Sequence, residues 1–242
     1  MSNRPNVLLL FSDEHRHDAM GCAGHERVKT PHLDALAENG TRFTQAFTPS
    51  PICVPARAAL ATGQYVHQNR CWSNAEAYSG DPVSWGHHLI EQGHRVDSIG
   101  KLHYRGGETH NGFEEEILPL YIRNGVGWIK GLLRDHEAFF DVSSYVREIG
   151  PGSDRYTDYD LGVTRAARQW LSDAGQAASE KPWVLFVSWL RPHYPLTCPP
   201  EYYDLYPLDK MDSARFVSDA ELPSHPVTRT IRRNFNYDDA FD

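Results

Sequence analysis

An α/β fold, with a sheet flanked by helices, is predicted by three features of this 242-residue sequence. Continuous aliphatic runs at 6–11 and 183–189 are typical of buried parallel strands. Segments with helical periodicity alternate with strand segments along the chain. Charged side chains follow strand 6–11 at once, which places them at the carboxyl end of a strand, where α/β proteins assemble their sites.

The elements follow in a regular order. We expect strands at 6–11, 41–47, 95–99 and 183–189, a helix from Pro31 that Gly40 stops, a helix from Pro55 that Gly63 closes, and helices at 84–92 and 157–171. Glycines interrupt the pattern throughout 106–152, which predicts a long irregular excursion on the substrate side of the sheet. The last segment, 205–242, is polar and broken by prolines, and residues 1–242 together form one domain.

Composition excludes several classes of function. The 32 acidic and 24 basic residues give a formal charge of −8, which argues against nucleic-acid binding. The short apolar run after the N-terminus is neither a signal peptide nor a membrane span, so we expect a cytoplasmic protein. The four cysteines are far apart, and they fit neither a disulfide framework nor a zinc finger.

One of these cysteines lies in an informative context. Cys53 stands just before the helix that Pro55 begins, and Arg57 follows one turn later on the same face. The helix N-terminus and the guanidinium both favour an anion or a thiolate there. Taken alone, Cys53 is better interpreted as a buried structural thiol and Arg57 as a surface cation.

The segment from Cys53 to Gly63 changes that balance, because Cys-Val-Pro-Ala-Arg followed by Ala-Ala-Leu-Ala-Thr-Gly resembles the signature of the type I sulfatases. The resemblance implies the alkaline phosphatase-like fold, with a mixed sheet flanked by helices. It also implies oxidation of Cys53 to formylglycine by a maturation enzyme, and hydrolysis of sulfate esters by the hydrated aldehyde. A hydrate has a second hydroxyl that can expel the sulfate, which an ordinary serine or cysteine lacks.

The same resemblance assigns a metal site. Asp13 takes the place of a metal-binding aspartate, Glu14 stands where the family usually has Asp or Gln, and position 53 completes the predicted ligands. Oxygen ligands suit a hard divalent cation, with Ca²⁺ preferred and Mg²⁺ or Mn²⁺ as alternatives. Without the resemblance, acidic residues after a strand would be interpreted as solvated.

Two later motifs resemble catalytic elements of the family. Lys101 and His103, in Gly-Lys-Leu-His, are implied to hold a sulfate oxygen and to assist the formylglycine hydroxyl. His193, in Pro-His-Tyr-Pro, is the candidate general acid for the leaving oxygen. The alternatives are a turn for the first motif and a histidine packed between prolines for the second.

Two weaker matches concern the substrate. Asn74 resembles an anion-binding asparagine of choline sulfatases and phosphonate monoester hydrolases. Trp128 lies where choline sulfatases place an aromatic residue against a quaternary ammonium, although a tryptophan among glycines is more commonly a packing anchor. Choline sulfate is therefore a hypothesis, beside aryl and alkyl sulfates.

The resemblance runs from residue 6 to about residue 200, and the later metal pair and second lysine of the family have no counterpart after His193. We therefore expect an incomplete N-terminal catalytic domain, with poor activity alone and exposed apolar surface. The alternative functions are hydrolysis of phosphonate or phosphate esters and a catalytically silent fragment. The expected partners are a small sulfate ester and the maturation enzyme, with no membrane partner; a homo-oligomer remains an open alternative.

Overall fold

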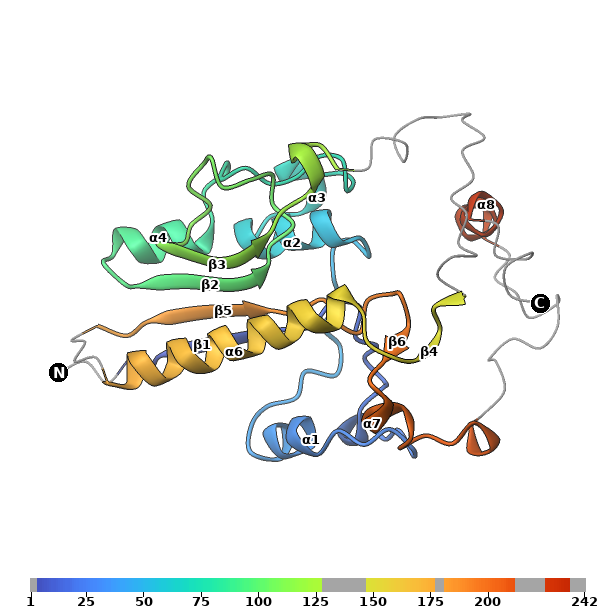
Figure 1. The fold of residues 1–242 in the computed structure, drawn as a ribbon. Helices are drawn as coiled ribbons and strands as arrows, with labels where there is room; N and C mark the ends of the chain where they lie inside the picture. Colours follow the sequence, from blue (N-terminus) through green and yellow to red (C-terminus); the bar gives the residue numbers. More distant parts are fainter. Residues whose placement is uncertain (1–3, 128–146, 177–180, 212–224, 236–242) are drawn as a thin grey trace.

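The computed structural model describes residues 4–127, 147–176, 181–211 and 225–235. Its main sheet has four parallel strands in the order β1-β5-β2-β3 (Figure 1). These strands are β1 (Val7–Phe11), β2 (Val96–Lys101), β3 (Glu115–Leu120) and β5 (Val184–Ser188). The α/β class is confirmed. Every strand pair among the described residues is parallel, so the antiparallel component of a mixed sheet is not found in this part of the chain.

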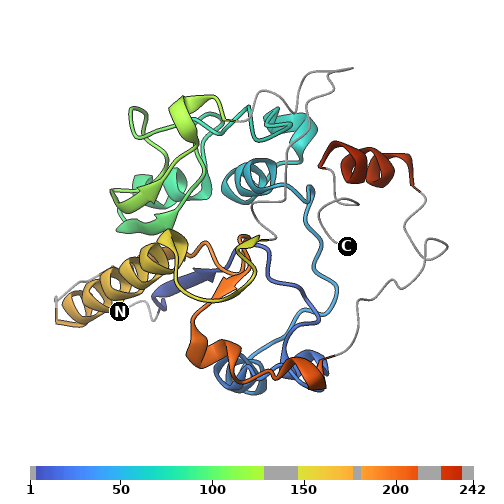
Figure 2. The same ribbon diagram turned by 45° about the vertical axis from the view of Figure 1, so that its right-hand side comes forward.

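Helices cover both faces of this sheet (Figures 1 and 2). The helix α6 (Arg155–Gln176) packs on one face, and α2 (Cys53–Thr62) and α4 (Trp85–Glu91) pack on the other. Within β5, Val184 and Phe186 join the α2 and α4 side, whereas Leu185 and Val187 join the α6 side. This two-sided burial explains why the strand sequence is continuously apolar rather than alternating.

The remaining elements are short and lie in the connections. They are η1 (Gly21–Ala23), α1 (Pro31–Glu38), α3 (Val66–Asn69), η2 (Arg123–Gly125), β4 (Gly150–Pro151), β6 (Thr197–Cys198), α7 (Pro200–Tyr203), η4 (Leu208–Lys210) and α8 (Pro226–Asn234). β4 and β6 form a second, two-stranded parallel sheet. No helix in the described ranges has the length and apolar character required to cross a membrane.

Most of the predicted elements are confirmed within one or two residues. The helix that contains Cys53 ends at Gly63, which adopts the left-handed conformation (φ 66°) that glycine tolerates at a helix C-terminus. The predicted helix at 157–171 is longer than expected, because α6 runs to Gln176. Helix α8 lies in the segment that the sequence indicated only as polar.

Two predictions of strands were wrong. The alternating segment 41–47 is not a strand, and Phe43 and Phe47 are 80% and 87% exposed. Alternation predicts a strand only where a neighbouring strand is available to pair, and none of the described strands lies against this segment. Conversely, β3 lies inside the stretch predicted to be irregular. It was missed because it contains Pro119 and a left-handed Leu118, which are tolerated here because β3 is an edge strand.

β1 is a strand, as predicted, but it occupies the opposite edge of the described sheet. Val7, Leu8 and Leu10 are between 40% and 55% exposed despite their aliphatic side chains. This agrees with the expectation of exposed apolar surface.

The register of the strands aligns their carboxyl ends. Phe11 pairs with Ser188, and Ser188 pairs with Gly100, so β1, β5 and β2 end side by side. The residues that follow these three strands therefore emerge at one edge of the sheet.

The buried hydrogen bond between Trp170 and Asp97 provides a test of the α6 packing. The Trp170 indole donates to Asp97 Oδ2 at 2.8 Å, and Asp97 is fully buried. We expect Trp170→Phe to lower the free energy of unfolding by about 1–3 kcal/mol, because a buried carboxylate loses a donor. The control is Trp183→Phe, which makes the same change in ring size at the neighbouring ring, 4.9 Å away. Urea denaturation of both variants separates the effect of the lost hydrogen bond from the effect of the smaller ring. Equal losses in the two variants would contradict the prediction.

Candidate active site

The candidate site lies at the carboxyl edge of the sheet, where α2 begins. Asp13 follows β1, Lys101 is the last residue of β2, and Ser188 is the last residue of β5. Cys53 is the first residue of α2 and faces this edge. Four segments distant in sequence thus meet at one place.

The first turn of α2 is held by Asn74. Ile52, at the N-cap, has no side chain that can accept a hydrogen bond from the helix, and Asn74 Oδ1 instead accepts one from Val54 N at 3.0 Å. An amide oxygen from a distant loop therefore replaces the usual N-cap side chain. Asn74 therefore lies beside the site, where this contact fixes the helix turn that carries Cys53, and its role toward a substrate anion stays a prediction.

Arg57 is buried, with only 3% of its surface exposed, so the interpretation of a surface cation is wrong. Its Nη1 donates to Lys101 O at 2.6 Å and to Ser188 Oγ at 3.1 Å, and its Nη2 lies 3.3 Å from Asp13 Oδ2. The guanidinium also lies over the Phe11 ring, 5.0 Å from its centroid. A single side chain of α2 thus contacts all three strand ends.

Lys101 and Asp13 form a second buried ion pair in direct contact. Burial raises the pKa of Asp13, but the charges of Lys101 and Arg57 outweigh it, so the pKa is lowered overall and Asp13 is ionised at neutral pH. Lys101 Nζ and Asp13 Oδ1 each lie 3.9 Å from Cys53 Sγ.

The surroundings of Cys53 do not favour a thiolate. Burial raises the pKa of the Cys53 thiol, and the negative charge of Asp13 raises it further. The positive charges of Lys101 and Arg57 lower it, but the pKa is raised overall. The expectation that the helix N-terminus and Arg57 would stabilise a thiolate is therefore corrected. The reason is that Arg57 is already paired with Asp13 and that Cys53 is partly removed from water.

His103 is a buried imidazole whose Nδ1 has no hydrogen-bond partner among the described residues. Burial, together with the Lys101 and Arg57 charges, lowers its pKa to about 3, so it is neutral at physiological pH. Its backbone has the left-handed φ of 55°, close to the bend that follows Gly100. A neutral imidazole with an unpartnered nitrogen can accept a hydrogen bond from a hydroxyl placed beside it.

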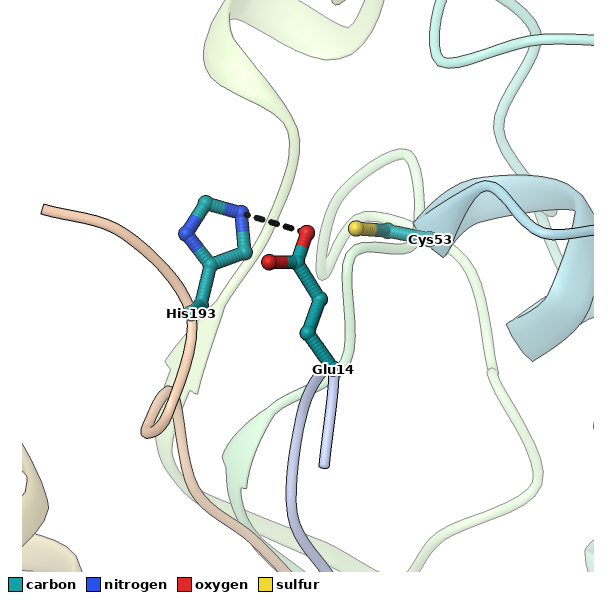
Figure 3. A group of neighbouring side chains, drawn as sticks. All are labelled: Glu14, Cys53 and His193. Carbon is teal, nitrogen blue, oxygen red and sulfur yellow. Dashed lines mark ion pairs between the residues drawn. The ribbon is translucent and has the colours of Figure 1, made fainter. Parts of the chain in front are cut away.

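Glu14, Cys53 and His193 point toward one another (Figure 3). Their candidate ligand atoms all lie within 4.8 Å of one another, and His193 Nε2 is 3.6 Å from Glu14 Oε1. Glu14 comes from the turn after β1, and His193 from the loop after β5 (Figure 3). The Glu14 carboxylate and the Asp13 carboxylate, whose Oδ1 is 3.9 Å from Cys53 Sγ, are oxygen donors that would fit a hard divalent cation if position 53 offered oxygen in place of sulfur.

Most of the predicted site residues are thus brought together. Trp128 lies outside the described residues. Ser188 was missed, although it had a recognisable signal, since it is a polar side chain that ends an otherwise apolar buried strand.

A family model described as Sulfatase matches residues 5–240. The chain belongs to the sulfatase family. It is 28% identical to a choline-sulfatase of Rhizobium meliloti over 96% of this chain and 50% of that protein. It is 38% identical to an ulvan-active sulfatase of Formosa agariphila, over 61% of this chain and 28% of that protein.

Solved structures agree on the fold. The phosphonate monoester hydrolase of Agrobacterium radiobacter aligns with a TM-score of 0.65 at 23% identity, over 87% of this chain and 45% of that one. The phosphonate monoester hydrolase of Silicibacter pomeroyi aligns with a TM-score of 0.62 at 23% identity, over 89% of this chain and 47% of that one. The sulfatase chain described here spans about half the length of the curated relatives it matches, or less.

Arg57 is expected to stabilise the folded chain as well as the site. Arg57→Met leaves Asp13 with one of its two cations and removes the donor to Lys101 O, so we expect a loss of about 3–5 kcal/mol in the free energy of unfolding. Arg16→Met is the matched control, because the Arg16–Asp18 pair is exposed and should contribute little to stability. Urea denaturation of both variants compares them, and similar small losses would show that the buried network is not what holds α2 to the sheet.

Proposed function

We propose that this chain carries the nucleophile of a sulfuric ester hydrolase, and that Cys53 is converted to formylglycine. The observation that carries the proposal is the convergence of Cys53, Lys101 and Asp13 within 3.9 Å at the carboxyl edge of the sheet, with Arg57 bonded behind them. Membership of the sulfatase family supports the same chemistry.

Each candidate residue has its own role in the proposed reaction. The formylglycine hydrate supplies one hydroxyl that attacks sulfur and a second that expels sulfate when it is deprotonated. Lys101 holds a sulfate oxygen, and its charge balances the negative charge that develops on that oxygen. His103, whose Nδ1 has no hydrogen-bond partner among the described residues, assists the formylglycine hydroxyl as its proton acceptor, and His193 protonates the leaving alcohol.

Asp13 and Glu14 would hold a divalent cation together with position 53, and the cation would act as a Lewis acid on the sulfate group. We retain Ca²⁺ as the preferred ion, with Mg²⁺ and Mn²⁺ as alternatives, because the carboxylates offer hard oxygen donors. The maturation enzyme is the protein partner that the chemistry requires. A cytoplasmic location and a homo-oligomer stay predictions.

The substrate is proposed to be a small sulfate ester. Choline sulfate is one candidate, supported by the choline-sulfatase similarity and by Trp128 and Asn74 in the sequence. The alternative reaction is phosphonate or phosphate ester hydrolysis, as in the phosphonate monoester hydrolases that share the fold. The Lys101 and His103 pair favours sulfate, because the motif resembles that of sulfatases and not that of the phosphonate group. A catalytically silent fragment is the remaining alternative.

Oxidation of Cys53 is the first test of the proposal. Peptide mass spectrometry of the protein from its native cell should show that the Cys53 peptide has lost sulfur and two hydrogens and gained one oxygen. The Cys71 peptide of the same digest is the internal control, and it should remain a thiol because Cys71 is buried outside the signature. An unmodified Cys53 in a cell that contains the maturation enzyme would argue for the silent fragment.

The choline hypothesis has a separate test on the matured protein. Trp128→Ala should raise the KM for choline sulfate about 5-fold to 30-fold, the loss expected of a cation–π contact worth about 1–2 kcal/mol. Hydrolysis of 4-nitrophenyl sulfate, which carries no cation, should keep its KM. Trp72→Ala, at an exposed tryptophan, is the control. An equal change for both substrates would exclude Trp128 as the ammonium contact.

A further inference from the structure

A stripe of polar side chains at the start of α6 is bonded to the segment that leaves β5. The stripe consists of Asp154, Thr157, Asp160 and Thr164, and intervals of three or four residues place them on one helix face. Every one of them is hydrogen-bonded to the segment 189–191. The function proposed above assigns no role to this contact.

Asp160 fixes the backbone of the segment. Its Oδ1 accepts from Leu190 N at 2.8 Å, and its Oδ2 accepts from Arg191 N at 2.8 Å. Both carboxylate oxygens are thus used by consecutive backbone amides. Thr164 Oγ1 accepts from the Trp189 indole at 3.0 Å and fixes the preceding residue.

Arg191 extends this attachment to the residues around His193. Its Nη2 donates to Asp154 Oδ1 at 2.6 Å, whereas its Nη1 donates to His193 O at 3.2 Å and also to Pro195 O. The same guanidinium therefore joins the start of α6 to two carbonyls of the His193 loop. Tyr156, on α6, lies edge-on to the His193 ring with 6.2 Å between centroids.

We propose that Asp160 and Arg191 are positioning residues that hold the His193 imidazole beside Glu14 and Cys53. The proposal rests on the proposed role of His193 in sulfate ester hydrolysis. No strand of the described residues pairs with His193, so the course of the loop depends on the turn in which His193 N donates to Leu190 O at 3.0 Å and on these side-chain hydrogen bonds. A displacement of about 1 Å at a reacting group is enough to reduce a rate by about 100-fold, which gives such a clamp a direct effect on catalysis.

The position of His193 can be measured without any reaction. In protein labelled with ¹³C-histidine, the His193 ring signal is assigned by its absence from His193→Gln. We expect Asp160→Asn to shift or broaden this signal, because an amide presents a donor to one of the two backbone N–H groups. Asp158→Asn is the matched control on the same helix, since Asp158 is exposed, and it should leave the signal unchanged. An unaltered His193 signal in Asp160→Asn would overturn the proposal.

A double-mutant cycle on the matured enzyme tests the catalytic consequence. With 4-nitrophenyl sulfate as the probe, Asp160→Asn should lower kcat between about 10-fold and 100-fold when His193 is present. It should cause no further loss in the His193→Ala background, because its effect passes through that side chain. A loss of equal size in both backgrounds would show a general structural role and would overturn the proposal.

The cycle also separates the two proposals. If His193→Ala alone leaves kcat unchanged, the role of His193 in the proposed function fails, whereas the ring signal still decides whether Asp160 positions it. If Asp160→Asn does not fold, Thr164→Val serves as the milder variant, because it removes the bond from the Trp189 indole and the bond that Thr164 donates to Asp160 O but leaves the Asp160 carboxylate in place. It should shift the His193 signal in the same direction by a smaller amount, and no shift would again overturn the proposal.

Discussion

The Asp13 carboxylate is the point at which the segments of the candidate site are tied together. It follows β1, and its two cationic partners come from α2 and from the end of β2. A carboxylate this well buried is stable only when paired, and a buried cation has the same requirement, so each of the three charges depends on the others. Removing Asp13 leaves two cations without their carboxylate, whereas removing Arg57 or Lys101 leaves Asp13 with a single cationic partner.

Arg57 converts this charge cluster into a geometric constraint. Its guanidinium bonds simultaneously to a backbone carbonyl of β2 and to the hydroxyl that ends β5. Its planar fork can satisfy several acceptors in fixed directions, which a lysine at position 57 could not do. Because Arg57 lies one turn after Cys53 on the same helix, the fork also fixes the direction in which residue 53 faces. The spacing of four residues between Cys53 and Arg57 thus has a structural cause of its own.

The extent to which this arrangement could be predicted depends on where its physical cause lies. Local sequence predicts the strands β1, β2 and β5 and the two ends of α2. A buried parallel strand is marked by a continuous apolar run, and the end of a helix by a glycine. The edge strand β3 and the failed strand at 41–47 depend on which neighbour pairs with them, which the local sequence does not encode. At the site, motifs predicted the convergence of Cys53, Lys101 and His193. They could not predict that Asn74 would cap α2 or that α6 would hold the His193 loop, because both contacts join residues far apart in sequence.

The raised pKa of Cys53 also bears on which nucleophile the site is built for. A cysteine nucleophile acts as a thiolate, and here burial opposes the thiolate more than Lys101 and Arg57 favour it. The same two cations are instead committed to Asp13, which keeps that carboxylate ionised beside position 53. An ionised carboxylate is of little use to a sulfur nucleophile, but it is a hard ligand for a cation that would also bind an oxygen at position 53. The charge arrangement around Cys53 therefore supports the proposal that position 53 acts through oxygen, as the proposed formylglycine would, rather than through a thiolate.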